Sequence, residues 1–297
     1  MVFALIISAF TAPDLQADED AAIRVLMASG ATVERDETRD GKPIRFVSCN
    51  LRQVTDDEIE ALKELENLPS IQFLGAGDAE ISVKTLQALQ RKPALKQFSI
   101  SYAKIGDEAA RTLGTLNSLT SLDLKVQIEC SPAGLGEILK LKGLRELTLS
   151  DRLVNDESLA NVGKQSSLQV LNLRSLFISD RGLAELRKLQ NLQTLRLFLG
   201  KDVTRDGLLQ LASVPVKDLE ITYFNASDAE IKELRKLNGL KILKLINARK
   251  VTGASIPYFS ELSELKELDI GGGQLTKEQL EELKQVLPKC KITESRQ

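Results

Sequence analysis

Apolar residues recur along this chain at a nearly constant interval, and this period limits the possible folds more than any other feature of the sequence. The period can be followed at one position, which is occupied in turn by Val47, Ile71, Phe98, Leu122, Leu147, Leu171, Leu195, Leu219, Leu243, Leu268 and Cys290. The successive steps are 24, 27, 24, 25, 24, 24, 24, 24, 25 and 22 residues. A fixed period of this length indicates a solenoid, because one unit can bury its apolar face only against a neighbouring copy.

The unit at residues 167–192 shows what each interval contains. Its first half reads L-x-x-L-x-L, and the alternation of Leu171 and Leu173 with polar neighbours predicts a short strand with one buried face. Its second half spaces leucines by three behind Ser179, whose hydroxyl can accept a hydrogen bond from a free helical N–H, so a short capped helix follows. Complete capping boxes are present in three other units, at residues 55–58, 227–230 and 276–279.

The stacking of such units determines the predicted shape. Parallel strands lie about 4.8 Å apart, whereas packed helices need roughly 8 to 10 Å. The stack must therefore curve toward its strands. We expect an α/β solenoid in the form of a horseshoe, with a parallel β-sheet on the concave face and short helices on the convex face.

These units resemble those of the bacterial leucine-rich repeat proteins, which read L-x-x-L-x-L-x-x-x-x-I-T-D-x-x-L-x-x-L-x-x-L. The resemblance covers residues 44–292, about eleven units. It implies a non-catalytic module that binds a protein or peptide partner on its concave face. The alternative is a substrate-recruiting adaptor subunit of an enzyme complex, similar to the leucine-rich repeat proteins of ubiquitin ligases.

One position departs from the family pattern. The family often has Asn, Cys or Thr three residues after the last strand leucine, where the side chain supports the turn. Here the position is occupied by Arg52, Ala76, Ala103, Gln127, Arg152, Leu176, Gly200, Phe224, Ala248 and Gly273. We therefore expect turns that are less regular than those of the family.

The two ends of the chain differ from the repeats. Residues 1–17 are compatible with a signal peptide, which would place the protein in the periplasm or outside the cell, although a positively charged start is missing. The alternative is an apolar segment that packs on the first repeat of a cytoplasmic protein. Residues 18–43 predict a helix and a hairpin that cap the solenoid, and residues 293–297 form a tail.

Charge and composition exclude several kinds of function. The 40 basic and 42 acidic residues nearly cancel, so no overall field favours nucleic acid as a partner. The chain contains no histidine, which removes the usual general base and most zinc sites. The apolar runs are too short for a membrane span. We expect no enzymatic activity, no metal and no cofactor.

The cysteines do not predict a disulfide. Cys49 and Cys290 are predicted at inward positions of the first and last strands, roughly 50 Å apart along the sheet at the spacing of parallel strands. Cys130 precedes a helix in the fourth unit and has no cysteine nearby in the sequence. All three are interpreted as small residues of the core.

The candidate binding surface lies on the exposed face of the later strands. Its middle position alternates in charge from unit to unit, which a merely solvated sheet surface would also show. Apolar and aromatic side chains beside these charges, Leu199 among them, favour a binding patch instead. We predict a partner-binding site formed by Arg174, Arg196, Phe198, Tyr223, Lys244 and Ile246. The basic residues in this set suggest an acidic partner.

Overall fold

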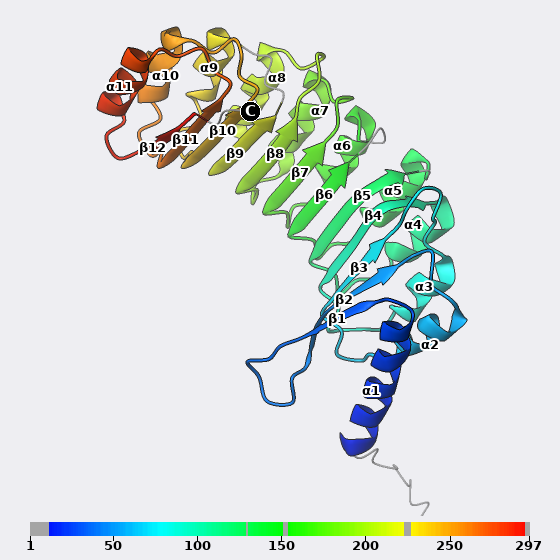
Figure 1. Ribbon diagram of the computed structural model, residues 1–297. Coiled ribbons are helices and arrows are strands. Elements are labelled where there is room, and N and C mark those ends of the chain that lie inside the picture. The colour runs from blue at the N-terminus through cyan, green and yellow to red at the C-terminus, as the bar shows by residue number, and fades with distance from the viewer. Residues whose placement is uncertain (1–11, 129, 151–153, 223–226, 295–297) are drawn as a thin grey trace, which may run out of the picture.

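The computed structural model describes residues 12–128, 130–150, 154–222 and 227–294. Figure 1 shows the strands side by side along the inner side of an arc, with the helices on its outer side. The sheet order follows the chain from β1 to β12 without a crossover, and every pairing from β2 to β12 is parallel. The predicted α/β horseshoe is thus confirmed.

Among the described residues, strands and helices alternate from β2 onward. They are α1 (Ala12–Ala28), β1 (Thr32–Arg35), β2 (Ile44–Asn50), α2 (Asp56–Glu64), β3 (Ser70–Leu74), α3 (Val83–Ala88), β4 (Gln97–Ile105), α4 (Asp107–Leu113), β5 (Ser121–Ile128), α5 (Pro132–Ile138), β6 (Glu146–Ser150), α6 (Asp156–Val162), β7 (Val170–Arg174), α7 (Asp180–Glu185), β8 (Thr194–Phe198), α8 (Arg205–Gln210), β9 (Asp218–Thr222), α9 (Asp228–Leu234), β10 (Ile242–Ile246), α10 (Ile256–Ser260), β11 (Glu267–Gly271), α11 (Lys277–Val286) and β12 (Lys291–Thr293).

The register of neighbouring strands matches the period in the sequence. Leu171 of β7 pairs with Leu195 of β8, and Leu173 pairs with Leu197. All four side chains are buried between the sheet and the helices. Burial of one leucine contributes on the order of 1.5 to 3 kcal/mol. The stacked leucines therefore form one continuous core along the arc.

The N-terminal helix and hairpin precede the repeats at one end of the sheet. Helix α1 begins at Ala12, earlier than the predicted start at Asp18, so it includes part of the segment compared above with a signal peptide. Ala22, Ile23 and Leu26 are buried, and the helix packs against α2. Strand β1 pairs with β2 in the antiparallel direction at the edge of the sheet.

The predicted register of the last unit is wrong. Leu268 of β11 pairs with Ile292 of β12, not with Cys290, and this restores the usual step of 24 residues. Cys290 lies before the strand and is only half-buried, whereas Cys49 is buried as predicted. Lys291, which the predicted register placed at the middle exposed position, pairs with Glu267 at the first one. The three cysteines are free thiols.

The helix N-termini are capped in two ways. In the first way, the cap lies within one unit. The predicted capping boxes at Thr55, Ser227 and Thr276 are confirmed, and Asn155 forms a further box with Ser158. Each box satisfies N–H groups that the first helical turn leaves without a partner.

In the second way, a carboxylate of the preceding unit binds the N-cap residue of the helix. Asp156 accepts hydrogen bonds from the backbone N–H of Ser179 at 2.9 Å and from its hydroxyl at 2.5 Å. A Cβ atom on Gly182, the third residue of α7, would lie 2.3 Å from Oδ1 of Asp156. The carboxylate of one unit therefore occupies the space that a side chain in the next helix would need.

Lys92 is a buried charge in the core. Lys92 occupies the repeat position that Leu116 and Leu141 occupy in later units. This position lies three residues before the first leucine of the next L-x-x-L-x-L segment. The ammonium group donates hydrogen bonds to the carbonyl oxygens of Lys63 and Leu65, each at 2.9 Å, at the C-terminal end of α2. Burial lowers the pKa of Lys92, while Glu66 and Glu64 oppose the shift.

Candidate functional site on the concave face

The concave sheet carries a hollow of about 430 Å³ that crosses the strands from β5 to β9. It is lined by Asp123, Lys125, Thr148, Asn172, Leu173, Arg174, Arg196, Leu197, Phe198, Glu220 and Thr222. Three of the six predicted site residues, Arg174, Arg196 and Phe198, thus come together in it. The hollow lies on this face because the lining side chains alternate along their strands with the buried leucines.

Arg174 and Phe198 form the aromatic part of the hollow. They are register partners on neighbouring strands, and the guanidinium carbon of Arg174 lies 5.5 Å from the centre of the Phe198 ring. This distance is within the range of a cation–π contact. Among the described residues, Arg174 has no carboxylate within ion-pair distance. Its positive charge is therefore available to a partner.

Arg196 lies in the middle of a polar network. It donates a hydrogen bond to Oδ1 of Asn172 at 3.3 Å, and its guanidinium lies 3.7 Å from Asp218 and 3.5 Å from Glu220. Asn172 in turn donates to the Thr148 hydroxyl at 2.9 Å. The network orders the floor of the hollow, although each exposed ion pair contributes only about 0 to 1 kcal/mol to stability.

The remaining predicted site residues do not line this hollow. Lys244 and Ile246 lie on β10, on the same face, and the ammonium of Lys244 pairs with Glu267 at 3.1 Å. The hydrogen bond to Glu267 raises the pKa of Lys244. Tyr223 lies outside the described residues. Leu199, expected on the exposed face, is buried in the core.

The predicted excess of positive charge is smaller than the sequence suggested. Asp218, Glu220 and Glu267 pair with Arg196 or Lys244. Asp218 and Glu267 occupy the first exposed position of their strands, and the prediction counted only Arg174, Arg196 and Lys244 against Glu220. The expectation of an acidic partner therefore depends mainly on Arg174.

The early wall of the hollow was missed by the sequence analysis. Lys125 pairs with Oδ2 of Asp123 at 2.7 Å, while Oδ1 of Asp123 is buried without a hydrogen-bond partner in the described structure. The signal that could have found these residues is their register, because Asp123 and Lys125 occupy the same two exposed positions as Arg196 and Phe198.

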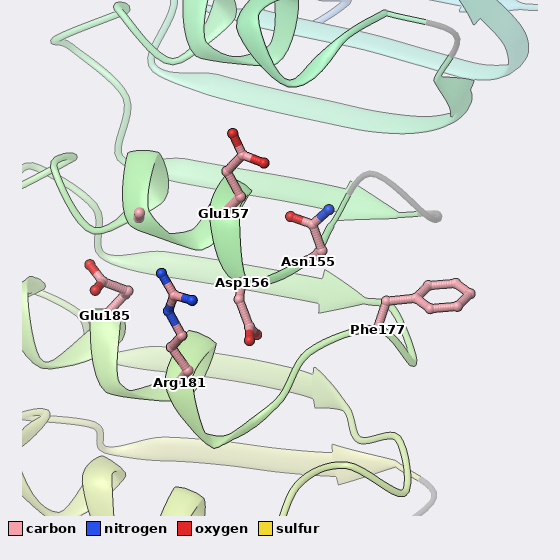
Figure 2. Close-up of a pocket in the computed structure, with 7 residues that line it drawn as sticks. Asn155, Asp156, Glu157, Phe177, Arg181 and Glu185 are labelled. Carbon is pink, nitrogen blue, oxygen red and sulfur yellow. The ribbon is translucent and has the colours of Figure 1, made fainter.

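A second hollow, of about 580 Å³, lies where the strands pass into the helices. It is lined by Asn155, Asp156, Glu157, Ala160, Phe177, Arg181 and Glu185. Figure 2 shows Phe177, in the turn after β7, pointing away from the helices that carry Glu157, Arg181 and Glu185. The sequence analysis did not single out this region.

Neither a metal site nor a membrane-spanning helix is found in the described ranges. Within residues 12–294, apart from the gaps given above, no cluster of three or more acidic or cysteine side chains could hold a metal ion. No helix in the same ranges has both the length and the apolar character needed to cross a membrane.

The repeat, the parallel sheet and its register define the protein as a leucine-rich repeat solenoid. No family model matches the sequence, and no curated protein matches it. Among solved structures, a chain of the yeast Rad7–Elc1 complex is similar over 82% of this chain and 66% of that chain, with 19% identity and a TM-score of 0.56. An internalin from Listeria monocytogenes aligns over 98% of this chain and 93% of that chain, with 15% identity and a TM-score of 0.47. At such identities the likeness concerns the fold alone.

Proposed function

We propose that the protein is a non-catalytic binding module that holds a protein or peptide partner on its concave face. The observation that carries the proposal is the Arg174–Phe198 pair, an exposed cation stacked on an aromatic ring at the rim of a hollow. Arginine and aromatic side chains are enriched among the residues that dominate binding energy at protein interfaces.

The surroundings of this pair support a preformed site. The chain of contacts from Thr148 through Asn172 and Arg196 to Glu220 crosses four strands and holds polar groups in fixed positions. A rigid surface loses little conformational entropy on binding. Lys244 and Ile246, and Tyr223 from the sequence analysis, extend the proposed contact along the same face.

The partner is proposed to place a carboxylate against Arg174. Because Arg196 and Lys244 are already paired, one such contact supplies most of the charge complementarity. Binding should weaken moderately with added salt, since Arg174 is the cation of this site that lacks a carboxylate partner among the described residues.

The test compares two double variants in affinity capture from the native host. Arg174→Ala with Phe198→Ala should release a partner that the wild type retains. Ser48→Ala with Ser99→Ala changes the same face at β2 and β4 and should leave capture unchanged. Equal thermal unfolding of both variants would show that folding is preserved. Loss of capture by the serine pair alone would contradict the proposed site.

The adaptor reading remains the alternative. A chain of similar fold is found in the yeast Rad7–Elc1 complex, where it is assembled with another protein. At 19% identity this likeness gives no residue that could be carried over to the present chain.

A further inference from the structure

Two large apolar side chains are exposed to solvent at the turn after β7. Leu176 is 52% exposed and Phe177 is 55% exposed. The backbone around them is nevertheless well anchored. The buried Ser175 hydroxyl donates to the carbonyl oxygen of Val154 at 2.6 Å and accepts a hydrogen bond from the backbone N–H of Phe177 at 3.2 Å. The exposure of these side chains is therefore a property of an ordered turn.

The fold does not require large apolar residues at these two positions. In the other units whose side chains are described at this turn, the equivalent pairs are Arg52–Gln53, Ala76–Gly77, Ala103–Lys104, Gly200–Lys201, Ala248–Arg249 and Gly273–Gln274. These residues are small or polar, and Ala103 and Ala248 turn into the core where Leu176 turns outward. Two neighbouring apolar side chains that are exposed in a single unit indicate a contact site rather than a requirement of core packing.

Charged side chains lie on both sides of this turn. On the concave side lies Arg174, which has no carboxylate partner in the described part of the chain. On the helix side lies the second hollow, with Glu157 at the start of α6 (Figure 2). The nearby Asp156 is engaged by Ser179, and Glu185 pairs with Lys188, but Glu157 has no basic partner among the residues described. Arg181 of α7 also lines this hollow, so the helix side carries both signs of charge, with Glu157 as its acidic group that lacks a basic partner among the described residues.

We propose that Arg174, Leu176, Phe177 and Glu157 form a docking edge for a protein segment of complementary order. The segment would place a carboxylate on Arg174, an apolar side chain on Leu176 and Phe177, and a lysine or arginine on Glu157. This inference deepens the proposed function, on which it rests, by extending the contact from the concave hollow over the edge toward the helices. Complementary charges at the two ends set the direction in which the segment lies.

The experiment uses a displayed library of random peptides selected on the immobilised full chain. The edge variant, Leu176→Ser with Phe177→Ser, is kept out of the selection and is used afterwards to test the enriched peptides. We expect enriched peptides with an apolar residue between an acidic and a basic one, and at least about tenfold weaker binding to the edge variant. Arg249→Ser, a change in the equivalent turn after β10, is the matched control and should bind these peptides like the wild type.

A charge reversal tests the assigned order. Glu157→Lys should weaken the selected peptides, and replacing their basic residue with glutamate should restore binding. The proposal is overturned if no peptide is enriched, if enriched peptides lack this order, or if they bind the edge variant as well as the wild type. It is also overturned if the wild type sediments as a dimer that the edge variant does not form, since a second copy would then be the occupant.

The same peptides separate this inference from the proposed concave site. Phe198→Ala alters the hollow and leaves Leu176, Phe177 and Glu157 in place. If the edge variant loses the peptides and Phe198→Ala keeps them, the docking edge stands and the concave site fails. If Phe198→Ala loses the peptides and the edge variant keeps them, the concave site stands and the docking edge fails.

Discussion

Asp180, the first residue of α7, accepts two hydrogen bonds from Thr204 of the next repeat, one from the backbone N–H at 2.7 Å and one from the hydroxyl at 2.5 Å. Thr204 caps the N-terminus of α8, so the carboxylate of one unit fixes the helix start of the following unit. Asp156 with Ser179 and Asp228 with Thr252 repeat the arrangement. These contacts join helices that are too short to be stable alone.

The Asp180 contact predicts a specific sensitivity at Gly207. A Cβ atom there would lie 2.1 Å from Oδ1 of Asp180, so Gly207→Ala must displace the carboxylate from Thr204. We expect the free energy of unfolding in urea to fall by about 1 to 3 kcal/mol. Gly239→Ala is the control, because a Cβ at Gly239 meets nothing within 4 Å. Equal stability of the two variants would contradict the role of the inter-unit cap.

The buried charge of Lys92 predicts that two apolar replacements at this position differ in stability. Lys92→Leu restores the leucine of the later units and removes a buried charge, so stability at pH 7 should equal or exceed that of the wild type. Lys92→Ala should lose about 2 kcal/mol or more, because it leaves a cavity. Urea unfolding of both variants measures the difference, and a leucine variant as unstable as the alanine variant would refute this account.

The pH dependence of the Lys92 variants has a defined sign. The pKa of Lys92 is lowered in the folded protein, so the folded state holds this proton less tightly than the unfolded state does. The cost of the buried charge is therefore full at neutral pH and shrinks as the pH rises toward 10.5, the ordinary pKa of a lysine. The advantage of Lys92→Leu over the wild type should narrow in that alkaline range.

The ion pairs of Glu233 predict that protein stability depends on pH in the acid range. Its side chain is almost wholly buried beside Lys236 and Arg205, and the hydrogen bond from Lys236, followed by those from Arg205, lowers its pKa. Its contribution to stability is present above pH 4.5, the ordinary pKa of a glutamate, and is lost as the pH falls through the lower pKa of the folded state. Glu233→Gln should therefore be less stable than the wild type at pH 7. Thermal unfolding should show this gap closing below about pH 4; a gap independent of pH would count against the ion pairs.

The cysteines test the corrected register of the last unit. Burial raises the pKa of Cys49 to about 12 and that of Cys130 to about 11, and both thiols should label slowly in the native protein. Cys290 is half-buried and its pKa is also raised, by burial and by Glu267, but an alkylating reagent can reach it first. Mass spectrometry of briefly labelled protein should find the modification at Cys290, and labelling of Cys49 at the same rate would contradict the register.

The features that repeat within one unit were predictable from the sequence. Alternation around Leu171 and Leu173 marked the buried face of a strand, and the spacing of leucines behind Ser179 marked a short helix. The capping box at Thr55 was equally visible, because its partner Glu58 is three residues away. Such signals are local, and stacking of similar units leaves a curved solenoid as the arrangement that buries the periodic leucines of all units.

The contacts between units were decided by the tertiary structure. Asp180 meets Thr204, and Arg196 meets Asp218, only because one unit is superposed on the next in a particular register. For the same reason Ile292, and not the nearer Cys290, pairs with Leu268. The concave hollow and the exposed turn at Phe177 depend on several units at once. The leucine period by itself determined the fold and its faces, whereas charge pairing and surface shape were settled by neighbours about 24 residues apart, whose exposed side chains carry no periodic signal.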